Sequence, residues 1–220
     1  MAKNRRPRRR DPGRSILAAA VVVALMAASF GLGWFLGVRS TRFHGNILLV
    51  NETHRLPADY VPEGLVNLYT QRHSFRMASS EIYLTRETYQ AMEKMFHAAE
   101  QADMNGYIVT SGYRSYHRQT EVYAQSEPGK AQQPGASEHQ TGLAFDVTVE
   151  TNDGFESTPQ YGWLMEHAHE YGFIQRYPAN KADITGISYE PWHYRYVGVE
   201  PATRIHETGQ TLEEFVRSNR

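Results

Sequence analysis

Two short stretches of the chain contain the side chains best suited to hold a metal ion. The first is SEHQTGLAFDV, residues 137–147, which contains His139 and Asp146 with Gly142 and Ala144 between them. Strand alternation places Ala144 and Asp146 on one face, among apolar neighbours. Burying a carboxylate there is costly unless a positive charge lies opposite it. The pair is therefore either part of a metal site or a simple histidine–aspartate hydrogen bond.

The second stretch, EPWH at residues 190–193, favours the metal. A catalytic zinc ion has three protein ligands and keeps one position for water, and hydrolysis also needs a carboxylate near that water but off the metal. We therefore predict that His139, Asp146 and His193 are the zinc ligands. Glu190 is then the general base, which takes a proton from water and passes it to the leaving amine.

The other histidines are expected to be structural. His167 and His169 are two residues apart, so on a helix they point to different faces. Surface or capping positions are expected for the remaining six, which are His44, His54, His73, His97, His117 and His206. The chain has no cysteine, so a metal must be held by histidines and carboxylates and no disulfide framework is available.

Helices and short strands must position these residues. Apolar residues three and four apart predict a helix over residues 85–104, and Pro159 and Gly172 mark the start and end of another over 158–172. Further expectations are strands at 46–51, 107–111 and 141–149, a helix at 115–126, an exposed loop at 127–136 and a β-prone segment at 189–198. Because strict strand–helix alternation is missing, we predict an α+β fold with a small antiparallel sheet flanked by helices.

The amino-terminal region differs in composition from the rest of the chain. Seven of the 23 Lys and Arg residues lie within residues 1–14, beside a single acid, Asp11. Residues 15–38 are uncharged and apolar, and a helix of this length can cross a bilayer. The alternative is a cleaved secretory signal, for which AAS at residues 27–29 imitates a cleavage site. The basic arm favours a cytoplasmic amino terminus with everything after about residue 39 outside the cell. A nucleic-acid-binding arm is disfavoured, because the arm adjoins a span and the remainder is acidic.

The two stretches resemble the signatures of a known enzyme family. SEHQTGLAFD fits the pattern S-x-H-x-x-G-x-A-x-D, and EPWH fits E-x-W-H, of the zinc D,D-carboxypeptidases related to VanY. SGYRSYHRQTEVY and LLVNETHRLPADYVPEGLV are similar to preceding segments of the same family. The resemblance runs from about Asn46 to the carboxyl terminus. It implies the zinc peptidase fold shared with the Hedgehog amino-terminal domain, and a Zn²⁺ cofactor.

The resemblance also assigns roles to single residues. His139, Asp146 and His193 match the zinc ligands, and Glu190 matches the catalytic base. Arg114 matches the arginine that steadies the substrate carbonyl and the developing oxyanion. The matches to substrate-binding positions are Ser137 and Gln119, which hydrogen-bond the terminal D-residue, and Trp192, which packs under the site.

The expected organisation has four parts. Residues 1–14 form a cytoplasmic basic arm, 15–38 a single transmembrane anchor, 39–60 a tether and leading segment, and 61–220 the zinc peptidase domain. The implied enzyme is a metallocarboxypeptidase of the cell membrane, not a serine-type one. Its catalytic domain is extracytoplasmic and removes the carboxyl-terminal D-alanine of peptidoglycan stem peptides.

Three alternatives remain open. The first two are an L,D-carboxypeptidase acting on tetrapeptide stems and a D,D-dipeptidase, although an extracytoplasmic location argues against the dipeptidase. The third is a zinc-stabilised module that binds cell-wall peptides without cutting them. Loss of the base would mark such a module, and Glu190 is present. The expected partners are stem peptides and the membrane, without nucleic acid, and the sequence indicates no oligomeric state.

Overall fold

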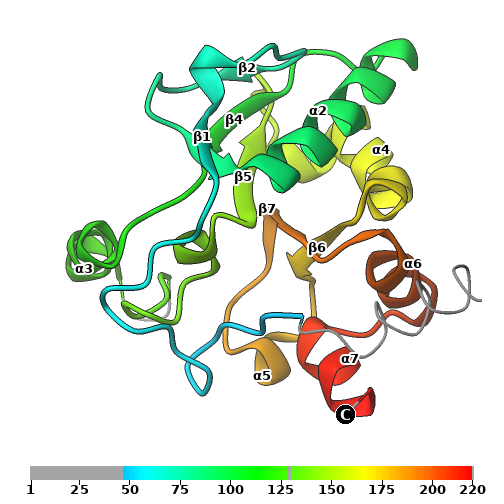
Figure 1. Cartoon of the computed structure of the whole chain (residues 1–220). Helices are drawn as coiled ribbons and strands as arrows, with labels where there is room; N and C mark the ends of the chain where they lie inside the picture. Colours follow the sequence, from blue (N-terminus) through cyan, green and yellow to red (C-terminus); the bar gives the residue numbers. More distant parts are fainter. Residues whose placement is uncertain (1–46, 128–129, 220) are drawn as a thin grey trace, which may run out of the picture. The chain divides into compact units, whose positions relative to one another are not determined.

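A five-stranded sheet with the strand order β2-β4-β5-β7-β6 organises the structure, beside a two-stranded sheet of β1 and β3 (Figure 1). This computed structural model describes residues 47–127 and 130–219. The predicted basic arm, the predicted span and the first part of the tether, with His44, lie outside these residues. Within the described ranges, no helix combines the length and apolar character needed to span a bilayer.

The elements follow one another in mixed order. The strands are β1 (Leu65–Asn67), β2 (Arg76–Met77), β3 (Tyr83–Thr85), β4 (Ile108–Ser111), β5 (Ala144–Thr148), β6 (Phe173–Tyr177) and β7 (Glu190–Tyr196). The α-helices are α2 (Arg86–Gln101), α3 (Tyr116–Gln125), α4 (Pro159–His167), α5 (Ala182–Thr185), α6 (Val199–Thr208) and α7 (Leu212–Ser218). The 3-10 turns are η1 (Leu68–Thr70), η2 (Glu138–Thr141), η3 (Phe155–Ser157) and η4 (Ala168–Tyr171).

The expected α+β fold with a small sheet is confirmed. β4, β5, β7 and β6 pair antiparallel, whereas the short edge strand β2 runs parallel to β4. β5 lies at the centre of the sheet. Its Phe145 and Val147 are fully buried on the core side, while Asp146 faces the other way, as strand alternation requires.

The main core lies between the sheet and α2. Thr85 caps this helix by accepting from the backbone N–H of Thr88. Met92, Met95 and Phe96 occupy positions i, i+3 and i+4, and they are buried along one face, as an amphipathic helix requires. The ring of Phe96 packs edge-on against Phe145 of β5 at 6.0 Å between centroids. The predicted helix over residues 85–104 is thus confirmed, with slightly tighter ends.

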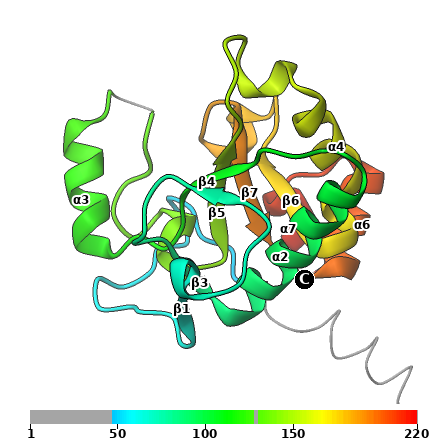
Figure 2. The same ribbon diagram turned by 90° about the horizontal axis from the view of Figure 1, so that it is seen from above.

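Helices cover the two sides of the sheet unequally. α2 and α4 lie on one side, α3 stands apart on the other, and α6 lies beside the edge strand β6 (Figures 1 and 2). A second apolar cluster joins β6 to α6 and α7, and consists of Ile174, Ala202, Ile205, Leu212 and Phe215. Both carboxyl-terminal helices therefore have a packing role that was not predicted from the sequence.

Two local expectations differ from the structure. Residues 47–50 form no strand, and Asn51 makes only an isolated bridge with His54. The carbonyl of Leu48 instead accepts a hydrogen bond from the Arg195 side chain at 2.7 Å, so a side chain takes the place of a strand partner. The predicted helix over residues 158–172 divides into α4 and η4 before Gly172, which has a φ of +87°.

Candidate metal centre and substrate cleft

Three elements bring the predicted metal ligands together. Asp146 on β5 is paired with His193 on β7 across the ladder. His139 lies on η2, directly before β5. Gly142 ends η2 with a φ of +66°, a conformation that glycine adopts without steric cost. The chain can therefore reverse from the turn into the strand and bring His139 back over Asp146.

The carboxylate of Asp146 lies between the two imidazoles. Its Oδ2 is 3.3 Å from His139 Nε2, and its Oδ1 is 3.0 Å from His193 Nδ1. One potential ligand atom from each residue lies within 4.8 Å of the others. Burial alone would raise the pKa of Asp146, but the two histidines hold that pKa well below its usual range. Two imidazoles and one carboxylate are a donor set that fits Zn²⁺ and leaves a position for water.

The orientation of His139 is fixed by the backbone. Its Nδ1 is 2.7 Å from the carbonyl oxygen of Gly112, and a carbonyl can only accept, so Nδ1 carries the proton. Nε2, which faces Asp146, is left with a free lone pair. In metal sites, the ring nitrogen that does not bind the metal usually donates a hydrogen bond, and this bond holds the imidazole in the correct tautomer.

Gly112 itself has no room for a side chain. A Cβ there would lie 2.5 Å from the carbonyl oxygen of Tyr83 and 2.9 Å from Cγ2 of Ile82. We expect Gly112→Ala to lower the free energy of unfolding by about 1–3 kcal/mol through overpacking, and to weaken zinc binding because the carbonyl that orients His139 must move. Chemical denaturation and zinc titration measure the two effects.

Gly162→Ala is the matched control for this substitution. Gly162 lies on α4, has an ordinary φ, and has no neighbouring atom within 4 Å of the position that an added methyl group would take. Alanine there is expected to stabilise the helix by about 0.5–1 kcal/mol. If Gly112→Ala behaved like Gly162→Ala in both measurements, the backbone around Gly112 would have no part in the site.

An irregularity in β7 brings Glu190 to the metal centre. Residues three apart on a regular strand point to opposite faces, which would separate Glu190 from His193. However, Gln175 pairs with Tyr194 while Tyr177 pairs with Glu190, so β7 contains two extra residues between these pairs. The side chain of Gln175 donates to the carbonyl of Glu190 at 3.1 Å and holds the irregular segment in place.

Glu190 lies beside the metal ligands without joining them. Its Oε2 is 3.9 Å from His193 Nδ1, and its side chain is 18% exposed. Burial raises the pKa of Glu190 to about 7. The nearby carboxylates of Asp146 and Glu138 also raise this pKa, whereas His193 and Arg114 lower it. A carboxylate with a raised pKa that borders solvent suits a general base.

All eight predicted site residues line one cleft of about 200 Å³. Arg114 lies in the segment before α3 and donates to Gln119 Oε1 at 2.8 Å and to Ser111 Oγ at 3.0 Å. Its backbone N–H donates to the carbonyl of His139 at 3.1 Å, which ties the arginine to the metal centre. Ser137, just before η2, is buried.

Trp192 differs from its expected placement. It lines the cleft but keeps 42% of its surface exposed, so it does not pack under the site. The extra residues of β7 direct it toward solvent between Pro191 and His193, which are buried. An exposed indole at a cleft offers an apolar surface to a bound ligand.

Three residues of this region were not predicted from the sequence. Glu138 and Tyr177 lie beside His193, at 3.5 Å between Oε2 and Nε2 and at 5.0 Å between ring centroids. Gly112 supplies the carbonyl for His139. The one available signal was the position of Glu138 beside a predicted ligand, since the partners of all three residues come from distant segments.

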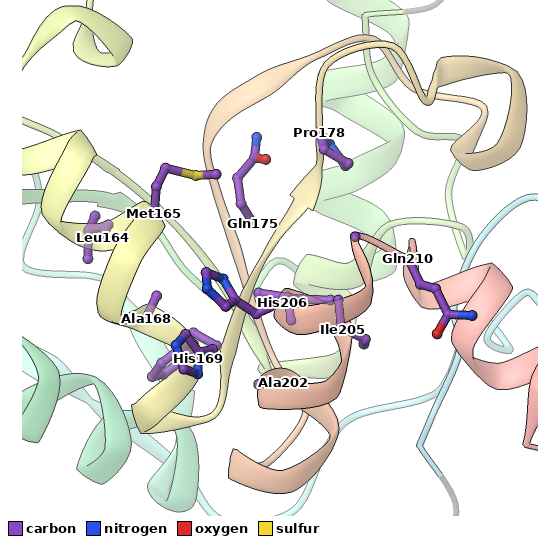
Figure 3. A pocket seen from close by; sticks show the side chains of 13 residues that line it. Leu164, Met165, Ala168, His169, Gln175, Pro178, Ala202, Ile205, His206 and Gln210 are labelled. Carbon is purple, nitrogen blue, oxygen red and sulfur yellow. The ribbon is translucent and has the colours of Figure 1, made fainter.

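The histidines expected to be structural lie away from this cleft in the described part of the chain. His169 stacks on His206 at 4.1 Å between ring centroids, and its Nδ1 is 3.2 Å from Thr203 Oγ1. Both line a second, mostly apolar hollow of about 150 Å³ formed by α4, η4, β6 and α6 (Figure 3). His167 instead contacts Glu170, so no metal pair forms with His169.

Comparison with known proteins decides the family. The family model described as VanY, D-alanyl-D-alanine carboxypeptidase, matches residues 81–199, a range that contains every predicted site residue. The chain belongs to the VanY family of carboxypeptidases. It is accordingly a metal-dependent carboxypeptidase, and its ligand set fits Zn²⁺.

Relatives within the family are similar over most of the chain. YodJ of Bacillus subtilis (strain 168), an inferred carboxypeptidase, is 40% identical over 195 residues, which cover 81% of this chain and 70% of YodJ. The D-alanyl-D-alanine carboxypeptidase of Enterococcus faecium is 34% identical over 177 residues. These cover 79% of this chain and 58% of that enzyme.

Solved structures that are similar in sequence share the fold. The LD-carboxypeptidase LdcB is 39% identical with a TM-score of 0.68, over 77% of this chain and 84% of that one. A variant of the vancomycin-resistance D,D-pentapeptidase VanY in complex with Zn(II) is 36% identical with a TM-score of 0.61, over 76% and 97% of the two chains. The similar structures thus include one named as an LD-carboxypeptidase and one named as a D,D-pentapeptidase.

Proposed function

We propose that the chain is a membrane-anchored zinc D-alanyl-D-alanine carboxypeptidase that removes the carboxyl-terminal D-alanine of peptidoglycan stem peptides. The observation that carries this proposal is the single cleft lined by all eight predicted site residues. It combines a metal-binding trio with an adjacent free carboxylate and a half-buried arginine. That combination suits hydrolysis of a peptide bond next to a free carboxyl terminus.

His139, Asp146 and His193 would hold the zinc ion. When bound, the ion supplies a Lewis acid that polarises the scissile carbonyl and acidifies water. Glu190 accepts the proton as the water oxygen adds to the carbonyl carbon. It then gives that proton to the amide nitrogen as the carbon–nitrogen bond breaks, which releases D-alanine with a neutral amine.

Arg114 is the group placed to counter the negative charge that develops on the carbonyl oxygen. The hydrogen bonds to Gln119 and Ser111 fix its guanidinium in the cleft, so little reorganisation is needed during the reaction. Gln119 and Ser137 would bind the terminal D-residue. The side-chain amide of Gln119 also donates to the carbonyl of Gln132 at 2.6 Å, which connects α3 to the loop that follows it.

Replacing Arg114 by Ala is expected to lower kcat by about 10²–10³-fold, the cost of removing one preorganised oxyanion donor. Zinc affinity should change little, because Arg114 contributes no ligand atom. Steady-state kinetics and zinc titration check both parts. Arg118→Ala is the control, since Arg118 is an exposed arginine of α3 paired with Glu121. Equal kcat values for the two variants would remove Arg114 from the mechanism.

The choice between D,D- and L,D-carboxypeptidase needs a product assay. LdcB, with a TM-score of 0.68, is named as an LD-carboxypeptidase, and this similarity supports the alternative on tetrapeptide stems. Pentapeptide and tetrapeptide stems should be incubated separately with the zinc-loaded protein and analysed by mass spectrometry. Cleavage of the pentapeptide supports our proposal, whereas cleavage of the tetrapeptide alone would support the L,D alternative.

The location outside the cell is proposed from the sequence of residues 1–38. A basic arm followed by an uncharged apolar stretch is typical of an anchor with a cytoplasmic amino terminus, and peptidoglycan lies on the other side of the membrane. The full chain with a carboxyl-terminal epitope tag should sediment with membranes, and protease added to spheroplasts should remove the tag. Release of the tagged protein into the medium would instead indicate a cleaved signal.

A further inference from the structure

A buried carboxylate that the mechanism above does not use lies next to the metal centre. Glu138 is adjacent in sequence to His139, and its side chain has no solvent exposure. Its Oε1 accepts two hydrogen bonds of 2.8 Å, from Arg176 Nε on β6 and from Arg195 Nη1 on β7. This oxygen is therefore fully occupied by the two arginines.

The other oxygen of Glu138 faces a predicted metal ligand. Oε2 lies 3.5 Å from Nε2 of His193. Neither atom has another hydrogen-bond partner among the described residues, although both are buried. The opposite ring nitrogen, Nδ1, faces Asp146. The two ends of the His193 ring thus have different neighbours, with the predicted metal position at Nδ1 and Glu138 at Nε2.

The position of Glu138 is fixed by a network that extends to the last helix. Arg176 also donates to both oxygens of Glu213 on α7, at 2.6 and 2.9 Å. Arg195 also donates to the carbonyl of Leu48. Two arginines thus face two carboxylates, so the buried charges balance, as burial of ions requires.

We propose that Glu138 is a positioning residue for the zinc ligand His193, an inference that rests on the ligand role given to His193 under the proposed function. Oε2 accepts the Nε2 proton of His193 and so selects the tautomer whose Nδ1 has a free lone pair. The arginines hold the carboxylate through Oε1 alone, which leaves Oε2 for the histidine. Each imidazole of the site then has an acceptor on the nitrogen that faces away from Asp146, a backbone carbonyl for His139 and a carboxylate for His193.

The competing explanation is that Glu138 only neutralises the arginines. Glu138→Gln separates the two roles because glutamine has one acceptor oxygen. If that oxygen faces the arginines, the amide NH₂ faces Nε2 of His193 and favours the tautomer with the proton on Nδ1, which cannot bind zinc. If the oxygen faces His193, the NH₂ faces the arginines. Glu213→Gln is the matched control, since it weakens the same network at Arg176 without touching His193.

The experiment measures metal binding by the full-length protein rather than turnover. Zinc affinity is obtained by competition with a chromophoric chelator, and the visible spectrum of the cobalt-loaded protein reports ligand geometry. We expect Glu138→Gln to weaken zinc binding by about 10–100-fold and to alter the cobalt spectrum. Glu213→Gln should keep both near wild type. Unchanged affinity in Glu138→Gln, or equal losses in the two variants, would overturn the proposal.

A second comparison covers the case in which Glu138→Gln does not fold. The double variant Glu138→Gln/Arg195→Met removes one buried charge of each sign and is compared with Arg195→Met alone. The proposal predicts that the double variant binds zinc about 10–100-fold more weakly than Arg195→Met alone. Equal zinc affinities of these two variants would contradict it. A protein that binds zinc normally but cleaves no stem peptide would refute the proposed function and leave this inference standing.

Discussion

Replacing Glu190 by Gln is expected to lower kcat by about 10²–10⁴-fold, the usual contribution of a positioned general base, and to leave zinc bound. Glutamine keeps the size of the side chain but cannot take a proton from water. The zinc should remain because Glu190 is not one of the three residues whose ligand atoms converge. Single-turnover kinetics with a pentapeptide substrate and metal analysis of the same preparation measure the two effects.

The control for this prediction is Glu166→Gln, which makes the same chemical change at a side chain 77% exposed on α4. It should leave both kcat and zinc content unchanged. Normal turnover by Glu190→Gln would show that another group moves the proton. Loss of zinc from Glu190→Gln would instead show that Glu190 is itself a ligand.

Replacing Asp146 by Ala should remove zinc and, with it, activity. The carboxylate lies between His139 and His193 and is the only anion among the three predicted ligands. Structural zinc sites are worth about 10–16 kcal/mol, so loss of one of three ligands is expected to weaken affinity by about 10³-fold or more. Inductively coupled plasma mass spectrometry after dialysis measures the bound metal.

Asp146→Asn keeps the volume of the side chain and tests the charge alone. It should also lose zinc, while the exposed Asp153→Ala variant keeps it. Far-ultraviolet circular dichroism shows whether each variant is folded. A folded Asp146→Ala protein that kept stoichiometric zinc would contradict the assignment of this ligand.

Local patterns in the sequence were sufficient to predict the elements that carry the metal ligands. The apolar spacing around Met92 and Phe96 predicted α2, and alternation around Asp146 predicted which face of β5 it occupies. The grouping of His139, Asp146 and His193 followed from ligand chemistry and from family signatures. The predictions for α2 and β5 succeeded because each depends on neighbours a few residues away. His193 lies 47 residues after Asp146, so its place in the site followed from the chemistry of its residue type and the signature and not from a local pattern.

Features that depend on distant partners were not predicted. Glu138 contacts Arg176 and Arg195, which are 38 and 57 residues away in sequence, so no local pattern marks its burial. The run at residues 46–51 has the composition of a strand. Residues 47–50 form none, and the carbonyl of Leu48 accepts from the distant Arg195 instead of from a neighbouring strand. Likewise, the exposure of Trp192 follows from the irregular pairing of β7 with β6, which alternation alone does not indicate.

The most direct test of the central claim is mass spectrometry of a pentapeptide stem ending in two D-alanines after incubation with zinc-loaded protein. We predict loss of one D-alanine residue to give the tetrapeptide, abolished by a chelator, restored by added zinc and absent with Glu190→Gln. Zinc-loaded wild-type protein that leaves the pentapeptide intact, or releases the same product at the same rate as Glu190→Gln, would contradict the account.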